Sequence, residues 1–118
     1  MNDFLYHYKM IVTKVVDGDT VHGNVDLGFG IVFNDMTFRF SGINAPEIHG
    51  PTADAGNKSK QHVIDTVLNK EVFIITKKDS QEKYGRFLAE IFYKDATGNY
   101  VSLNKEMVTM GLAKEFMV

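Results

Sequence analysis

Three strand-like segments, joined only by short turns, dominate the first third of this chain. Residues 8–17 are rich in β-branched side chains and predict a strand. From Val21 to Leu27 apolar and polar residues alternate, and residues 36–41 repeat that period of two. The turn signature Asp17-Gly18-Asp19 precedes the second segment. After this segment, Gly28-Phe29-Gly30 permits a sharp bend or bulge, and Asn34-Asp35 predicts a turn. Because short connections favour antiparallel neighbours, we expect a β-meander.

The rest of the chain alternates helix and strand patterns. Residues 46–57 contain both prolines and read as a loop, and a helix is expected from about Ala53 to Asn69. Short apolar runs at residues 72–75 and 87–93 predict two further strands. A stripe of Leu and Met over residues 103–110, followed by glycine, predicts a second, shorter helix.

This order of elements predicts a mainly β chain of the α+β class, a five-stranded OB-fold Greek-key barrel with two packed helices. An SH3-like barrel or a plain α+β sheet fits the pattern nearly as well. The length of 118 residues suits one domain spanning residues 1–118. Without cysteine, any metal must be held by oxygen or imidazole ligands. The chain has no apolar stretch of membrane-spanning length and no signal-peptide layout, so we expect a cytoplasmic protein without a membrane partner.

Arginine is used at only two positions, although the chain has thirteen basic residues. Arg39 lies in the stretch from Phe38 to Glu47, and Arg86 ends the run Glu82-Lys83-Tyr84-Gly85-Arg86. A planar guanidinium can hold a phosphate through two hydrogen bonds, which lysine cannot do. Together with Glu47 and the acidic turn before the second strand, the two arginines indicate metal-assisted phosphodiester cleavage.

Each of these motifs also has an ordinary interpretation. The Asp-Gly-Asp sequence alone is more often a plain turn, and Arg39 could form a surface ion pair. Glu47 could cap the following segment, and Arg86 could be a simple loop residue. The net charge of −2 does not indicate nucleic-acid binding, although residues 58–86 carry seven basic and four acidic side chains. The functional interpretation of each motif is therefore favoured because all of them occur together in one chain.

Four of these motifs, in this order, resemble the staphylococcal nuclease (thermonuclease) family over nearly the whole chain. They are Asp17-Gly18-Asp19-Thr20, the stretch from Arg39 to Glu47, Lys83-Tyr84-Gly85-Arg86, and the segment from Asn104 to Lys114. The resemblance implies an OB-fold barrel that binds Ca²⁺ and cleaves DNA and RNA. The products in such a family carry a 3′-phosphate and a 5′-hydroxyl.

The resemblance also implies a calcium site and the residues that support it. Asp19 would bind the metal through its carboxylate, Asn44 through its side chain and Ala45 through its backbone carbonyl. Asp17 and Thr20 would lie behind these ligands and orient them.

The catalytic roles implied by the resemblance fall on three residues. Arg39 and Arg86 would hold the scissile phosphate and neutralise charge that develops at phosphorus, and Glu47 would orient or deprotonate the attacking water. Lys83 and Tyr84 would contact a neighbouring phosphate of the nucleic acid.

Asn44 departs from the family pattern, which commonly has aspartate at that position. An amide oxygen can still bind calcium, but the site loses one negative charge, and ligand charge is a main determinant of calcium affinity. We therefore expect weaker metal binding than in a site with two carboxylates. The alternative function is a non-catalytic OB-fold module that binds single-stranded nucleic acid. A protein-interaction domain is a third possibility, and the sequence does not indicate an oligomeric state.

Overall fold

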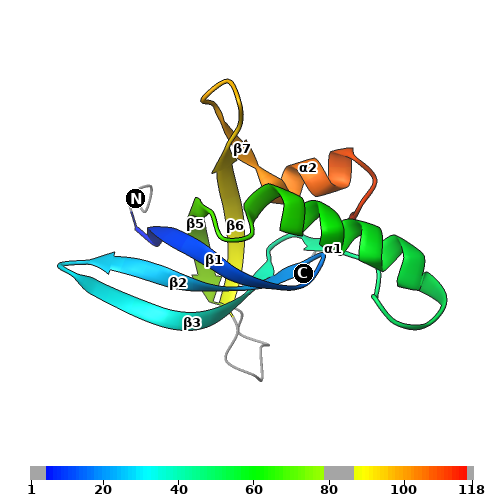
Figure 1. Cartoon of the computed structure of the whole chain (residues 1–118), viewed down its shortest axis with the longest axis horizontal. Coiled ribbons are helices and arrows are strands. Elements are labelled where there is room, and N and C mark those ends of the chain that lie inside the picture. Colours follow the sequence, from blue (N-terminus) through cyan, green and yellow to red (C-terminus); the bar gives the residue numbers. More distant parts are fainter. Residues whose placement is uncertain (1–4, 79–86, 117–118) are drawn as a thin grey trace.

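Five strands close into a barrel in the computed structural model, which describes residues 5–78 and 87–116 (Figure 1). They are β1 (His7–Asp17), β2 (Thr20–Gly28), β3 (Ile31–Phe40), β5 (Glu71–Lys78) and β6 (Phe87–Lys94). Neighbours in the order β3-β2-β1-β5-β6 are antiparallel, and a short parallel pairing between β3 and β6 closes the ring. The prediction of an α+β fold built on a five-stranded OB-type barrel with two helices is confirmed.

Smaller elements complete the described part of the chain. They are β4 (Ile43–Asn44), a 3₁₀ turn (Gly50–Thr52), α1 (Ala53–Val67), β7 (Tyr100–Ser102), α2 (Leu103–Thr109) and β8 (Lys114–Glu115). The sequence did not predict β4, β7 and β8, because strands of two or three residues are too short to show a period. No helix among the described residues is long and apolar enough to cross a membrane.

The connection between β2 and β3 differs from the expectation. The predicted turn at Asn34-Asp35 is wrong, because both residues lie inside β3. The chain reverses at Phe29 and Gly30, within the sharp bend predicted for residues 28–30, where φ is 57° and 76°. Asn34 and Asp35 form a bulge: β2 pairs Val25 with Phe33 and then Gly23 with Met36. The result is a long two-stranded ribbon that extends beyond the barrel (Figure 1).

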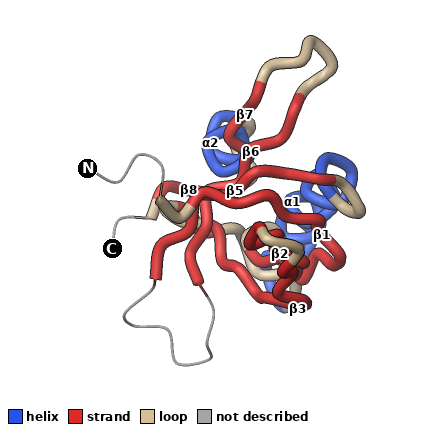
Figure 2. The backbone as a smooth tube through the Cα atoms, turned by 90° about the vertical axis from the view of Figure 1, so that its left-hand side faces the viewer, coloured by secondary structure: helices blue, strands red, loops and turns tan. Residues whose placement is uncertain are grey.

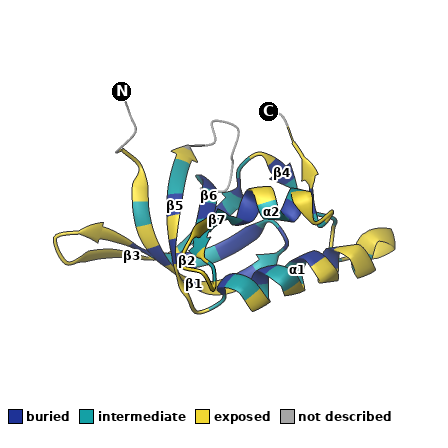
Figure 3. Cartoon of the chain, turned by 90° about the horizontal axis from the view of Figure 1, so that it is seen from above, coloured by how far each residue is buried: buried dark blue, intermediate teal, exposed yellow. Residues whose placement is uncertain are grey.

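The core lies between the barrel wall and the two helices. Alternate strand residues point inward, and one face of each helix covers them (Figure 3). The largest fully buried side chains include Met10, Phe38, Phe40, Ile74, Ile91, Leu103 and Met107. The packed face of α1 is formed by Gly56, Ser59, Val63 and Val67. Figure 2, which looks from the tip of the ribbon toward the barrel, shows the strands wrapping around this centre.

A buried asparagine of α2 stabilises the closure of the barrel. The Asn104 side chain is 3% exposed. Its Oδ1 accepts a hydrogen bond from the backbone N–H of Ile91 at 3.0 Å, and its Nδ2 donates to the carbonyls of Ser41 at 2.9 Å and Ala89 at 3.0 Å. All three bonds join α2 to the place where β3 ends beside β6.

Candidate active site

Arg39 lies on β3, and neighbouring strands of the barrel pair with β3 on both sides of this residue. Its neighbours Phe38 and Phe40 are buried in the core, so the period of two places Arg39 on the outer face. Across the sheet it lies opposite Thr20 of β2 and Leu88 of β6. The side chain is 20% exposed. Arg39 therefore presents its guanidinium from a rigid strand and not from a loop.

The guanidinium of Arg39 meets two oxygen groups from different parts of the chain. Its Nη2 donates a hydrogen bond to Oδ1 of Asn44 and lies 4.0 Å from Oδ2 of Asp19. The backbone N–H of Ala45 donates to Oδ2 of Asp19 at 2.9 Å, and the Thr20 hydroxyl donates to Oδ1 of Asp19 at 3.1 Å. Asp19, Arg39, Asn44 and Ala45 therefore converge at one point of the surface, although they come from separate segments.

Asp17 supports the turn that carries Asp19. Oδ1 of Asp17 accepts the backbone N–H of Asp19 at 3.0 Å. Burial, followed by the hydrogen bonding and negative charge of Asp19, raises the pKa of the Asp17 carboxyl to about 6. Two carboxylates lie close together here, so the site carries negative charge that a cation would stabilise.

The donor atoms at this point are oxygens of the chemical kinds that a hard cation prefers. Asp19 contributes a carboxylate and Asn44 an amide oxygen, and calcium accepts both kinds together with backbone carbonyls and water. Ala45 meets Asp19 through its N–H, and its carbonyl as a metal ligand stays a prediction. The described residues contain no group of three or more His, Cys, Asp or Glu side chains that could hold a metal. The residues therefore fit a calcium ion with few charged ligands, and the amide of Asn44 is shared with Arg39.

Glu47 lies three residues after Asn44, in a loop that packs tightly on α1. The side chain of Glu47 is exposed, and in the described part of the chain it forms no ion pair. Its carbonyl accepts a hydrogen bond from the Thr52 hydroxyl at 2.9 Å. A Cβ built on Gly56 of α1 would lie 2.5 Å from the Glu47 carbonyl carbon and 2.8 Å from the nitrogen of Ile48. Only glycine at position 56 lets this loop come so close to the helix.

A second glycine fixes the acidic turn against the same helix. A Cβ on Gly18 would lie 2.7 Å from Cβ of Ser59 and 2.8 Å from Cβ of Ala45. The hydroxyl of Ser59 donates to the carbonyl of Leu112 at 2.5 Å. Helix α1 is thus the common support of the turn that carries Asp19 and of the loop from Asn44 to Glu47.

Sequence reasoning missed Phe116, which lies beside Arg39. The guanidinium carbon of Arg39 is 5.5 Å from the centre of the Phe116 ring, which is within cation–π range. The strand β8 pairs with β4, and the N–H of Phe116 donates to the carbonyl of Gly42 at 2.8 Å. No sequence signal pointed to this contact, because it depends on pairing between residues 43–44 and 114–115.

An open cleft of about 720 Å³ begins at Phe116. Its wall contains Ser41, Gly42, Lys77, Asn104, Lys105 and Phe116. Glu90 and Glu115 line the cleft as well, and Nζ of Lys105 lies 4.0 Å from Oε2 of Glu90, so its basic and acidic side chains balance. The exposed ring of Phe116 is the group in this wall that is suited to stacking on a base. The predicted substrate residues Lys83 and Tyr84, and the second arginine, Arg86, lie outside the described residues, so their roles stay predictions.

Comparison with known proteins finds a matching family and similar proteins. Residues 37–118, more than half of the chain, match the family described as "Staphylococcal nuclease homologue". The chain is 31% identical to the uncharacterized protein MJ1439 of Methanocaldococcus jannaschii, over 94% of this chain and 60% of that protein. It is also 31% identical to a Bacillus subtilis protein named "Endonuclease YhcR", over 94% of this chain but 9% of that protein. The chain therefore spans only part of the relatives it matches.

Proposed function

Because this chain belongs to the staphylococcal nuclease homologue family, we propose that it is a calcium-dependent nuclease that hydrolyses phosphodiester bonds of DNA and RNA. The observation that carries the proposal is the convergence of Arg39, Asp19 and Asn44 at one surface point. A relative named as an endonuclease supports the same class of reaction. We further propose that the products carry 3′-phosphate and 5′-hydroxyl ends.

In this reaction the oxygen of a water molecule forms a bond to phosphorus, and the bond from phosphorus to the 5′ oxygen breaks. The carboxylate of Glu47 accepts a proton from the water, and the 5′ oxygen takes up a proton as it leaves. Arg39 binds the non-bridging oxygens and stabilises the charge that grows on them. Arg86 is expected to act on the same phosphate.

Calcium bound at Asp19, Asn44 and the Ala45 carbonyl would supply positive charge beside that phosphate. Asp17 and Thr20 orient Asp19 through the hydrogen bonds described above. The bond from the Ala45 N–H further restricts the carboxylate of Asp19. These contacts hold Asp19 in one position before any ligand arrives, which lowers the cost of organising the site.

A cleavage assay on labelled single-stranded DNA and RNA tests the proposal. We expect products with 3′-phosphate ends in calcium and none in chelator. Arg39→Lys keeps the charge but loses the planar fork, and Glu47→Gln keeps the shape but loses the base, so each should lower the rate at least about a hundredfold. Wild-type rates in either variant would refute the assigned roles.

The alternative function remains a module that binds single-stranded nucleic acid without cutting it. The amide at Asn44 favours this alternative, because it removes one negative charge from the metal ligands. Tight binding of the labelled strand without cleavage at any calcium concentration would establish it. Such a binder would tolerate Glu47→Gln, whereas the nuclease would not.

A further inference from the structure

The ribbon formed by β2 and β3 has an apolar tip that the barrel does not cover. We call residues 27–33 of this hairpin the apolar ribbon. Its large apolar side chains are 40% to 102% exposed, and in Figure 3 this part of the hairpin is coloured as exposed. They are Leu27, Phe29, Ile31, Val32 and Phe33. Exposed apolar patches of this kind usually mark a binding surface.

Phe29, at the tip of the ribbon, has an unfavourable backbone conformation. Phe29 and Gly30 form a two-residue turn with positive φ at both positions, which is the geometry in which Asn-Gly is preferred. A bulky side chain is disfavoured at positive φ. The ring of Phe29 gains nothing from the barrel, since it is fully exposed. A strained, solvated phenylalanine indicates a role in binding.

The charges around the ribbon select the kind of partner. From Val15 to Phe38 the chain has no lysine or arginine, and it has four aspartates. Asp26 and Asp35, which flank the tip, are both exposed. The hairpin itself therefore offers no basic side chain to a polyanion such as nucleic acid or to an anionic membrane, although Lys9 of β1 lies opposite Asp26. The ribbon is therefore suited to an apolar protein surface.

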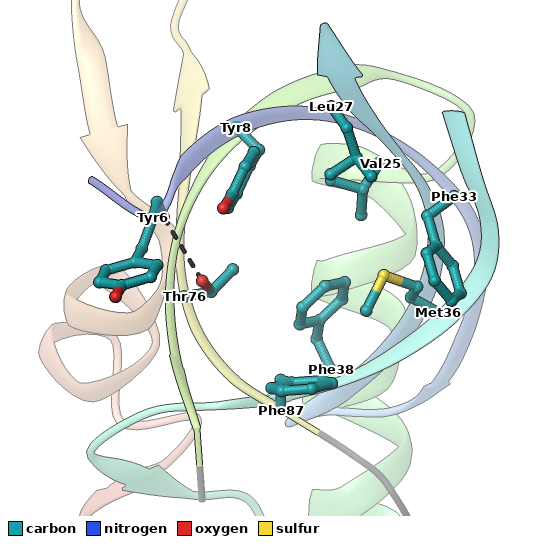
Figure 4. Close-up of a pocket in the computed structure, with 9 residues that line it drawn as sticks. All are labelled: Tyr6, Tyr8, Val25, Leu27, Phe33, Met36, Phe38, Thr76 and Phe87. Carbon is teal, nitrogen blue, oxygen red and sulfur yellow. Dashed lines mark hydrogen bonds between the residues drawn. The ribbon is translucent and has the colours of Figure 1, made fainter. Parts of the chain in front are cut away.

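The ribbon offers an edge and a pocket that complement its own tip. Among the described residues, β3 pairs from Ile31 to Met36 with β2 alone, so its other edge is free. At the base of the ribbon an apolar pocket of about 230 Å³ opens into the end of the barrel (Figure 4). Phe33 and Met36 of β3 line one side of it. A cavity of about 150 Å³ already holds a benzene ring, so this pocket can accept a phenyl side chain.

We propose that the apolar ribbon binds a second copy of this chain. Two β3 edges pair antiparallel about a two-fold axis near Phe33, and Phe29 of each copy then reaches the pocket beside Met36 of the other. The exposed fractions of the five tip side chains add up to about three whole side chains. At roughly 200 Å² for each side chain, full coverage would bury at most about 600 Å² per copy and about 1,200 Å² in total, which is the lower end of a specific interface.

Sedimentation equilibrium of the wild type and two variants tests the proposal. We expect the wild type to change from one to two chains between micromolar and submillimolar concentration. Phe29→Asn should weaken association at least about tenfold, while the melting temperature of the monomer stays equal or rises, because asparagine tolerates positive φ. Met110→Asn, which removes an exposed apolar side chain directly after α2 (55% exposed, against 102% for Phe29), is the control and should leave association unchanged.

Two results would overturn the proposal. One is a wild type that stays monomeric at all concentrations, and the other is a dimer that Phe29→Asn and Ile31→Lys both leave intact. Phosphatidylcholine vesicles distinguish a lipid occupant. Pelleting of a monomeric wild type with these vesicles, lost in Phe29→Asn, would replace the second copy by a neutral membrane surface.

Discussion

Replacing Gly56 by alanine should disable the proposed nuclease more than it destabilises the fold. A Cβ at this position would overlap the Glu47 backbone, since it would lie 2.5 Å from the carbonyl carbon and 2.8 Å from the next nitrogen. Ordinary carbon contacts are at about 3.5–4.0 Å, so the Glu47 loop must move by about 1 Å. A misplacement of about 1 Å can lower an enzymatic rate about a hundredfold.

The effect of Gly56→Ala on stability is smaller because two contributions oppose each other. Alanine stabilises a helix interior by about 1 kcal/mol relative to glycine. Overpacking against the loop costs about 1–3 kcal/mol. The net loss in the free energy of unfolding is then about 0–2 kcal/mol. If the variant remains folded at the assay temperature, a loss of activity can be separated from a loss of stability.

Cleavage rates in calcium and urea unfolding curves, measured on the same protein, test this reasoning. The matched control is Asn57→Ala, the next residue of α1, whose exposed side chain donates only to the carbonyl of Ala53 at 2.9 Å. We expect this control to keep full activity and stability. A Gly56→Ala variant with wild-type activity would refute the reasoning, because it would mean that the loop moves freely or that Glu47 is not part of the chemistry.

Two further predictions concern the charge of the site. Asn44→Asp adds a carboxylate beside Asp19 and should tighten calcium binding by about tenfold or more, measured by calorimetric titration; equal affinities would show that charge count does not limit the site. The raised pKa of Asp17, about 6 against 3.8 in the unfolded chain, means that the folded state binds the proton more tightly. Its carboxyl therefore lowers stability as pH rises from about 4 to 6. In chelator, Asp17→Asn should raise the free energy of unfolding by about 1–2 kcal/mol at pH 8, less than the full shift implies because solvent screens this partly exposed carboxyl, and by less than about 0.5 kcal/mol at pH 4. Asp26→Asn, whose side chain accepts a similar local turn contact, should leave the free energy of unfolding unchanged at either pH.

The sequence predicted the barrel because the strand periods and turn residues are local signals. The alternation around Phe38, Arg39 and Phe40 was enough to place the arginine on the outer face, and the structure agrees. The ribbon was predicted less well. Both the stretch from Gly28 to Gly30 and Asn34-Asp35 carry turn residues, and only the pairing register decides which of them reverses the chain.

The candidate site could be predicted only in part. The resemblance indicated that Asp19 and Asn44 act together, and the structure brings both to Arg39. Nothing local to Gly56 or Phe116 marks them, because their importance comes from contacts with distant segments. Close approach of two backbones and pairing of two-residue strands are tertiary effects that no sequence period encodes.

The hydrogen bonds of the buried Asn104 amide form only when the barrel is completely folded. This amide joins Ser41, two residues after Arg39, to Ala89 and Ile91, so a long loop of chain must close before these bonds form. Such non-local contacts come at a high entropic cost and tend to form late. A partly folded chain would then have its helix and hairpins but no assembled candidate site. If the protein is the proposed nuclease, the cells that make it would be exposed to this activity only after the barrel has closed.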